Sequence, residues 1–369
     1  MLVSFIRKFK IVILFSLFFF YLGCGITLSL IRLDCADAVT KTFKSDPDIT
    51  TSSDGIEYAV LVFSGPENKN KRDAIRSTWA KLANNIFKEN GEKLYKWNHT
   101  KISRQNQQNI IKLYFVIGLQ KLSLLEIMKL NDENSRSNDM LLIDDLQDSY
   151  DNLTSKVLKA LKWFSENLKN LRYLIKCDDD SFVRIDLIVR DLEAFAPKMD
   201  GEEIKSFVSY KVGWLKSHSA YNGLYWGYFS GKAKVFMSGK WKETDWFLCD
   251  NYLPYARGGG YVISRSIVDF VGKNAELLSH YNSEDVSMGV WTAPLDRINR
   301  VHDVRFDTEW KTRGCLTNML VRHKQTPSDM FQLFKNLINS HGNKLCKHES
   351  TERKSYHYNW NVLPSECCH

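Results

Sequence analysis

The hydrophobic and polar positions of the chain form short apolar runs that alternate with amphipathic segments. Between two of these runs, apolar residues recur at helical spacing over 153–168, and Thr326 with Pro327 has the pattern of a capped helix start. Strands that alternate with helices predict an α/β fold with a largely parallel sheet covered on both faces. The runs with the length of buried strands are 58–64, 112–118, 140–144, 171–175 and 261–264.

The N-terminal segment has a different pattern, an uncharged apolar run of 21 residues over 11–31. Such a run is long enough to cross a bilayer as a helix. Basic residues within 1–10 precede it, which predicts a cytosolic tail there and a lumenal location for the rest of the chain. A signal peptide cleaved near 36–38 is the alternative, but its apolar run would have only about 7–15 residues. Polar residues 32–55 are expected to form a stem before a folded domain over 56–369.

Two further features are typical of a lumenal protein. Asn98 and Asn152 each begin an N-glycosylation sequon. Two of the 8 cysteines lie in or beside the apolar segment, which leaves six for disulfides whose pairing the sequence does not decide. No CxxC pair supports a zinc site, and the adjacent Cys367 and Cys368 suggest a C-terminal tail that is stapled down instead.

Composition narrows the class of protein. A content of 44% hydrophobic and 25% charged residues is ordinary for a globular domain. The net charge of +8 is spread along the chain without a long basic run, so a nucleic-acid partner is not expected. The 13% aromatic content suits stacking on sugar rings and suits a packed core equally well. The glycine-rich dinucleotide fingerprint is absent.

Candidate chemistry gathers after the fourth predicted strand, where Lys176 precedes Asp178, Asp179 and Asp180. Ligands of open α/β sheets bind at the carboxyl ends of strands. Adjacent carboxylates repel one another, and a divalent cation with nucleotide phosphates would supply the counter-charge. A solvated acidic turn is the alternative. His323, which follows another strand-like run, is either a further metal ligand or a structural residue.

Three other groups of residues are candidates for the same site. Glu284 and Asp285 form a second carboxylate pair, in which one group has a raised pKa and acts as general base, or in which both only start a helix. Arg72 and Arg76 share a helix face and either meet a diphosphate or form a solvated basic surface. The glycines of 258–260 permit close backbone approach to a ligand, or a tight turn.

In this order along the chain, the motifs resemble the β1,3-glycosyltransferase family of type II Golgi enzymes. The matching motifs are RxxxRxTW over 72–79, KxDDD over 176–180, YxxGxGYV over 255–262 and EDV over 284–286. Within the family, the chain is most similar to galactosyltransferases that add the second galactose of the glycosaminoglycan–protein linkage region. That similarity lies in segments 228–234, 248–256, 306–309, 313–315 and 323–325 and in the Cys367-Cys368 ending, whereas the polar stretch 84–108 departs from the family.

The resemblance implies a GT-A type, Rossmann-like mixed sheet flanked by helices, behind one transmembrane helix in the Golgi membrane. It implies inverting transfer from UDP-galactose, with Mn²⁺, to the 3-hydroxyl of galactose in Gal-β1,4-Xyl on proteoglycan core proteins. Asp285 would be the general base, and Asp180 and His323, with Asp178, the metal ligands. The donor-binding residues that the resemblance implies are Arg72, Arg76, Trp79, Lys176, Asp178, Asp179, Tyr255, Gly259, Gly260 and Glu284.

Two alternative functions stay open at this point. The same scaffold could transfer N-acetylglucosamine or N-acetylgalactosamine to another glycan. It could also be a catalytically silent lumenal chaperone or lectin, against which the joint presence of the acidic triplet and Asp285 argues. The oligomeric state, including association with itself or with other Golgi transferases, is left open.

Overall fold

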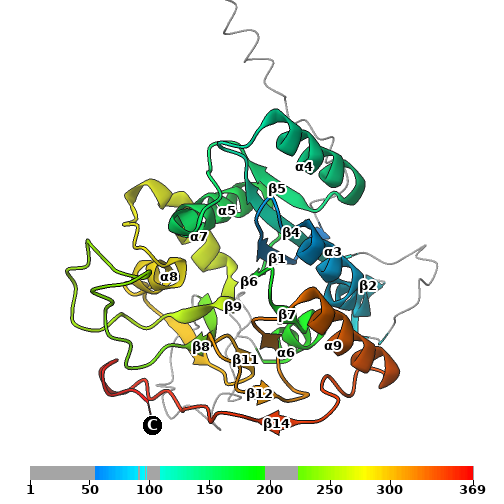
Figure 1. The fold of residues 1–369 in the computed structure, drawn as a ribbon. Coiled ribbons are helices and arrows are strands. Elements are labelled where there is room, and N and C mark those ends of the chain that lie inside the picture. Colours follow the sequence, from blue (N-terminus) through cyan, green and yellow to red (C-terminus); the bar gives the residue numbers. More distant parts are fainter. Residues whose placement is uncertain (1–54, 90–91, 96, 98–108, 196–222, 369) are drawn as a thin grey trace, which may run out of the picture. The chain divides into compact units, whose positions relative to one another are not determined.

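The computed structural model describes residues 55–89, 92–95, 97, 109–195 and 223–368 (Figure 1). The predicted membrane span over 11–31, nearly all of the predicted stem and Asn98 lie outside these residues. Within the described ranges, no helix is both long and apolar enough to span a bilayer.

A mixed seven-stranded sheet lies at the centre of the described chain, in the order β10-β8-β9-β6-β1-β4-β5. Strand β1 runs parallel to its neighbours β4 and β6, and β4 runs parallel to β5. Strand β9 lies antiparallel between β6 and β8, which pairs in parallel with β10. The strands are β1 Tyr58–Phe63, β4 Ile111–Gly118, β5 Met140–Ile143, β6 Tyr173–Asp178, β8 Gly223–Phe229, β9 Ala256–Ser264 and β10 Ile298–His302. The prediction of a mainly parallel α/β sheet is confirmed, including all five of the predicted strands.

Helices cover both faces of the sheet because successive strand residues enter two different cores. All six residues of β1 are buried; Val60 and Val62 pack in one core, and Ala59 and Leu61 in the other. Apolar residues of α3, α4, α6 and α9 join the first core, and those of α5, α7 and α8 join the second. The helices are α3 Lys69–Ser77, α4 Leu124–Ser137, α5 Leu153–Asn167, α6 Ile185–Phe195, α7 Arg265–Lys273, α8 Glu284–Thr292 and α9 Pro327–Asn339, with 3-10 turns at Trp79–Asn85, Tyr150–Asn152 and Ala275–Leu277.

The helix starts follow their sequence signals. The Thr326 hydroxyl accepts from the backbone N–H of Asp329, whose carboxylate accepts from the N–H of Thr326, so the predicted cap of α9 is confirmed. Helix α8 begins at Glu284, which places Glu284 and Asp285 in its first turn. Carboxylates are favoured there because the N-terminal end of a helix carries partial positive charge.

Three small sheets complete the described fold. A three-stranded sheet in the order β11-β13-β7 brings the chain before His323 to the end of β6. The others pair β12 with β14, and β2 with β3. Their strands are β2 Ile86–Glu89, β3 Glu92–Tyr95, β7 Phe182–Val183, β11 Phe306–Asp307, β12 Gly314–Cys315, β13 Val321–Arg322 and β14 Ser350–Thr351.

Four of the six cysteines in the described residues form disulfides. Cys315 at the end of β12 is bonded to Cys346, which ties the loop after α9 to the small sheets. Cys367 and Cys368 are bonded to each other, so this disulfide does not itself tie the predicted stapled tail to another segment. Hydrogen bonds hold the tail instead, including one from the N–H of Lys232 to the carbonyl of Pro364.

Candidate active site

The acidic triplet lies where β6 ends, and its three carboxylates point to different partners. Asp178 and Asp180 turn toward His323, and their side chains are 33% and 23% exposed. Asp179 is buried and accepts hydrogen bonds from Ser64, Asn68 and Lys71 at 2.8, 2.8 and 2.9 Å. Asp179 therefore holds the loop between β1 and α3, and the other two carboxylates form one side of a polar site.

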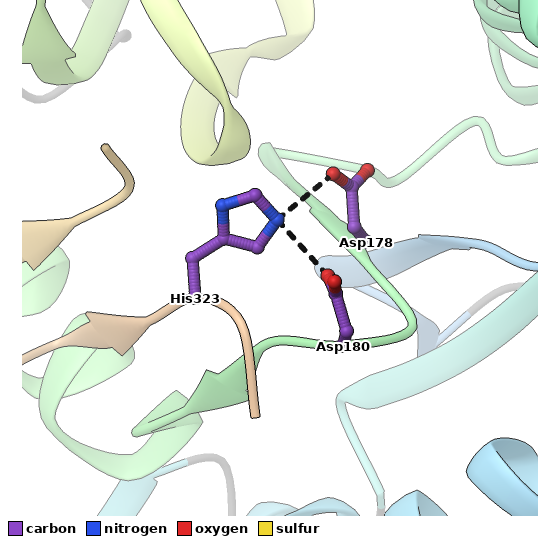
Figure 2. Close-up of side chains that lie close together, drawn as sticks. All are labelled: Asp178, Asp180 and His323. Atoms are coloured by element: carbon purple, nitrogen blue, oxygen red, sulfur yellow. Dashed lines mark ion pairs between the residues drawn. The ribbon is translucent and has the colours of Figure 1, made fainter. Parts of the chain in front are cut away.

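His323 meets these two carboxylates from the chain that follows β13 (Figure 2). Its Nε2 atom lies 2.9 Å from Oδ1 of Asp180 and 3.4 Å from Oδ2 of Asp178. The backbone fixes its position, because the N–H of His323 donates to the carbonyl of Asp307 at 3.0 Å. Burial lowers the pKa of His323, but the two carboxylates outweigh it and raise the pKa to about 9.

The donor set of this cluster suits a divalent cation. One ligand atom from each of Asp178, Asp180 and His323 lies within 4.8 Å of the others. Oδ1 of Asp180 and both ring nitrogens of His323 are buried, yet none makes a hydrogen bond of normal geometry to the described residues. Two carboxylates and an imidazole are ligands that transition metals accept, and an ion among them would satisfy these buried atoms. Among the residues that the structure describes, these three are thus the group that could hold a metal.

Lys176 connects this cluster to the second carboxylate pair. Its buried Nζ donates to Oδ1 of Asp178 at 2.9 Å, to the carbonyl of Gly258 at 2.7 Å and to Oε1 of Glu284. Burial disfavours the ammonium, but the charges of Asp178 and Glu284 outweigh that effect and raise the pKa of Lys176. A permanent cation therefore sits between the two acidic groups of the site.

Asp285 lies next to this lysine network in the first turn of α8, and it is only partly buried. Its Oδ2 accepts from the N–H of Gly258 and its Oδ1 from the N–H of Val286, both at 2.9 Å. Burial raises the pKa of Asp285, against the lowering effect of these bonds. A carboxylate that is held by two backbone groups and has a raised pKa is suited to accept a proton.

The glycines of β9 make room for side chains of the site. A Cβ on Gly258 would lie 2.8 Å from Oε1 of Glu284, and one on Gly259 would lie 2.6 Å from Nδ1 of His323. A Cβ on Gly260 would meet Val321 at 2.9 Å. These positions thus need glycine for the close approach of Glu284, His323 and β13. The predicted contact of Gly259 and Gly260 with a donor sugar stays a prediction.

Arg72 and Arg76 are brought together, but their donors are directed at protein groups. The fully buried Arg72 directs all five of its N–H groups to Glu133, Ser64 and the carbonyls of Gly65 and Pro66. Arg76 binds the carboxylates of Glu133, Asp139 and Asp73, with nitrogen–oxygen distances of 2.7–2.9 Å. A pocket of about 630 Å³ beside them is lined by residues of α3 and α4.

The other predicted residues occupy distinct places. Trp79 is fully buried in the first core, and Tyr255 packs in a small hydrophobic cluster with Tyr252, Tyr281 and Val286. Asn152 is partly buried and donates through Nδ2 to the carbonyl of Gln147 at 3.1 Å. Glycosylation of Asn152 remains a prediction.

The structure adds two basic residues that sequence reasoning missed. Nζ of Lys71 binds Asp179 at 2.9 Å, and Nζ of Lys324 binds Oδ2 of Asp180 at 3.0 Å. Lys71 directly precedes Arg72, and Lys324 directly follows His323. Their positions beside predicted residues could have indicated a place in the site, but a single lysine forms no distinctive motif.

Comparisons with known proteins agree with this geometry. The family described as Galactosyltransferase matches residues 70–303, which include the triplet, Lys176 and Asp285. The mouse protein named beta-1,3-galactosyltransferase 6 is 40% identical over 310 residues, 84% of this chain and 82% of its own length.

More distant matches have the same kind of name. A zebrafish UDP-GalNAc:beta-1,3-N-acetylgalactosaminyltransferase 2 is 32% identical over 45% of this chain and 29% of its own length. The match to a solved structure of galactosyltransferase LgtC with donor and acceptor sugar analogs covers 67% of this chain and 74% of that chain, at 9% identity and a TM-score of 0.33. The family match and the mouse relative show that the chain belongs to the galactosyltransferase family, among its β1,3-glycosyltransferases.

Proposed function

We propose that this protein transfers galactose from UDP-galactose to the 3-hydroxyl of the galactose in Gal-β1,4-Xyl-O-Ser of proteoglycan core proteins, with inversion at the transferred carbon. Membership of the galactosyltransferase family supports the reaction class. The 40% identity to a protein named beta-1,3-galactosyltransferase 6 supports the donor and the linkage. The linkage-region acceptor is proposed on the segments of the sequence that resemble such enzymes.

One observation carries the proposal: a three-residue ligand cluster and a carboxylate with a raised pKa are joined through one buried lysine. Lys176 bonds to Asp178 in the cluster and to the carbonyl of Gly258, and the N–H of Gly258 bonds to Asp285. Transfer from a sugar diphosphate requires charge compensation at the diphosphate and a base at the acceptor hydroxyl. This connection holds both groups in one site.

Asp285 has the role of general base in the proposed reaction. The acceptor 3-hydroxyl loses its proton to Asp285 as its oxygen attacks C1 of galactose from the face opposite the leaving diphosphate, which inverts that centre. The N–H groups of Gly258 and Val286 each bind one carboxylate oxygen and fix its direction. Each oxygen keeps a second lone pair, with which the carboxylate can take the proton.

Asp180 and His323, with Asp178, would hold Mn²⁺, and Lys324 and Lys71 add positive charge beside the triplet. A bound divalent cation neutralises charge on a leaving diphosphate, so no protein acid is required. Arg72 and Arg76 would have to break their present bonds to reach a phosphate. We therefore assign them a positioning role: Arg72 binds Ser64, which in turn binds Asp179, and Arg76 ties α3 to α4 through Glu133.

The proposal includes a location. We propose a type II protein of the Golgi membrane, anchored by residues 11–31, with residues 56–369 as its lumenal catalytic domain; the length and charge of the N-terminal segment support it. Digestion of sealed microsomes with protease tests this directly. The domain should be protected until detergent opens the vesicles, and protection of the N-terminal tail instead would contradict the orientation.

The test of the reaction uses the full chain in detergent with Mn²⁺, UDP-galactose and a Gal-β1,4-Xyl glycoside. A β1,3-linked galactosyl product that is lost when EDTA is added would support the proposal. UDP-N-acetylgalactosamine and UDP-N-acetylglucosamine are the matched donors. Transfer from one of these, and not from UDP-galactose, would keep the reaction class and reject the donor.

A further inference from the structure

The loop between β8 and β9 carries a group of large aromatic side chains that are not packed away. Phe236 is 46% exposed and Trp241 is 43% exposed, although aromatic rings of this size are usually well buried. In Figure 1 this loop, in light green, lies beside α8. It thus approaches the helix whose first turn holds Asp285.

Hydrogen bonds tie the loop to the residues just before Asp285. Nδ2 of Asn282 donates to the carbonyl of Lys240 at 3.0 Å and to that of Lys242 at 3.3 Å. The backbone N–H of Asn282 donates to the buried carboxylate of Glu243 at 3.0 Å. These three bonds hold residues 240–243 against the start of α8.

Tyr150 reaches the same place from another part of the fold. It begins the 3-10 turn that leads into α5, where the hydroxyl of Thr154 donates to the carbonyl of Tyr281 at 2.7 Å. Thr154 also lies 3.4 Å from the hydroxyl of Ser287, so α5 contacts the chain both before and after Asp285. Burial raises the pKa of Tyr150, and the nearby charges of Asp285 and Asp178 raise it further.

Tyr150 and Trp241 meet as a pair. The indole N–H of Trp241 donates to the hydroxyl oxygen of Tyr150, and Nζ of Lys240 covers the Tyr150 ring at 3.7 Å from its centroid. Phe236 supports Trp241 from one side, with ring centroids 5.8 Å apart. The Tyr150 oxygen accepts from the indole, and among the described residues it donates no hydrogen bond, so its O–H proton is available to a ligand.

We infer that Trp241 and Tyr150 form the acceptor subsite, in which the Trp241 ring stacks on the C–H face of a pyranose and the Tyr150 hydroxyl donates to one of its hydroxyls. An exposed ring face beside a free polar donor is the combination that binds an uncharged sugar ring. The pair is attached to the segments on both sides of Asp285. An acceptor sugar must lie there if it is to present its hydroxyl to that base. This inference rests on the proposed function, since it specifies where that reaction's acceptor binds.

The test compares Trp241→Ala, Trp241→Phe and Tyr150→Phe with Phe331→Ala, an exposed aromatic of α9, in the full chain. Initial rates give KM and kcat for the Gal-β1,4-Xyl glycoside and, separately, KM for UDP-galactose. Trp241→Ala, which loses the stacking ring, should raise the acceptor KM about tenfold. Trp241→Phe should keep the acceptor KM within about threefold of the wild-type value. Loss of the Tyr150 hydroxyl should raise it about three- to tenfold. The donor KM should stay unchanged in all four variants, and Phe331→Ala should match the wild type.

A second readout separates this inference from the proposed function. NMR titration of the same glycoside onto the protein with Mn²⁺ and UDP measures acceptor affinity without turnover. Binding that Trp241→Ala weakens about tenfold supports the subsite. An unchanged acceptor KM and affinity in Trp241→Ala, with normal transfer by the wild type, would overturn the subsite alone. No transfer and no acceptor binding by the folded wild type would overturn the proposed acceptor, and the subsite with it.

Discussion

Replacement of Arg72 by methionine separates a structural role of this residue from a role in phosphate binding. Arg72 is 0% exposed, and its guanidinium bonds to both oxygens of Glu133 at 2.8 Å and to the hydroxyl of Ser64 at 3.2 Å. Methionine fills much of the same volume and removes the charge. The result expected from these contacts is a less stable fold that still binds metal and UDP.

Arg72→Met should lose stability because the carboxylate of Glu133 keeps its charge. Removal of one partner of a buried ion pair costs about 3–5 kcal/mol, because the other charge is left uncompensated. Arg76 still contacts Glu133 at 2.7 Å, so we expect the low end, about 3 kcal/mol. At roughly 2 °C per kcal/mol for a domain of this size, the Tm should fall by about 6 °C.

The pH dependence of stability gives an independent check on the same network. Burial opposes ionisation of Glu133, but the hydrogen bonds from Arg72 and Arg76 outweigh it and lower its pKa from 4.5 to about 2. A folded-state pKa below the unfolded one means that the stabilisation is complete above about pH 4.5 and is lost as the pH falls toward 2. Glu133→Gln should flatten the stability profile in this window.

The assay is thermal unfolding at a fixed scan rate, together with titration of UDP in the presence of Mn²⁺. Arg72→Met/Glu133→Met removes both charges, and it should recover part of the Tm that Arg72→Met loses. UDP affinity should stay within about threefold of wild type in each variant, since less than 1 kcal/mol is at stake for a residue without phosphate contact. A normal Tm with UDP binding weakened tenfold or more would refute this reasoning and restore Arg72 as a phosphate ligand.

Three further results are expected. Asp180→Ala and His323→Ala should each weaken Mn²⁺-dependent UDP binding about 10-fold or more in calorimetry, because each removes a ligand from the cluster; unchanged binding would place the metal elsewhere. Gly259→Ala should weaken Mn²⁺-dependent UDP binding about 10-fold without removing a ligand, because the added Cβ would lie 2.6 Å from Nδ1 of His323. Normal metal affinity in this variant would show that the His323 ring moves freely. The acid limb of kcat/KM should have its midpoint above the ordinary aspartate pKa of about 3.9, because burial raises the pKa of Asp285 and only the ionised form accepts a proton; a limb below that value would argue against Asp285 as the base.

The sequence was sufficient for features that depend on local pattern. Apolar runs identified β1 and β4–β6, and the Thr326-Pro327 cap identified the start of α9, because burial and capping act over a few residues. The position of the acidic triplet at the end of β6 followed from the same pattern. Its approach to His323 was expected from family resemblance, and the ion pairs of His323 with Asp178 and Asp180 agree with it.

Features that depend on contacts between residues far apart in the chain could not be predicted from the sequence. No residue near Arg72 in the sequence indicates that the Arg72 guanidinium forms an ion pair with Glu133, which lies on a different helix. The triplet looks uniform in sequence, yet backbone direction at the turn sends Asp179 to the β1–α3 loop and its two neighbours to His323. The Cys315–Cys346 pairing likewise depends on how β12 meets the loop after α9. The Tyr150–Trp241 pair joins segments that no shared motif connects.

The central claim is that Asp285 takes the acceptor proton in a site whose donor binding depends on other residues. Asp285→Asn keeps the shape of the side chain but cannot accept a proton, so its kcat for galactosyl transfer measures this claim most directly, with Mn²⁺-dependent UDP affinity determined on the same preparation. The account predicts that kcat falls by about 10²–10⁴-fold while UDP affinity stays at the wild-type value. Turnover close to that of the wild type would contradict it and require another base.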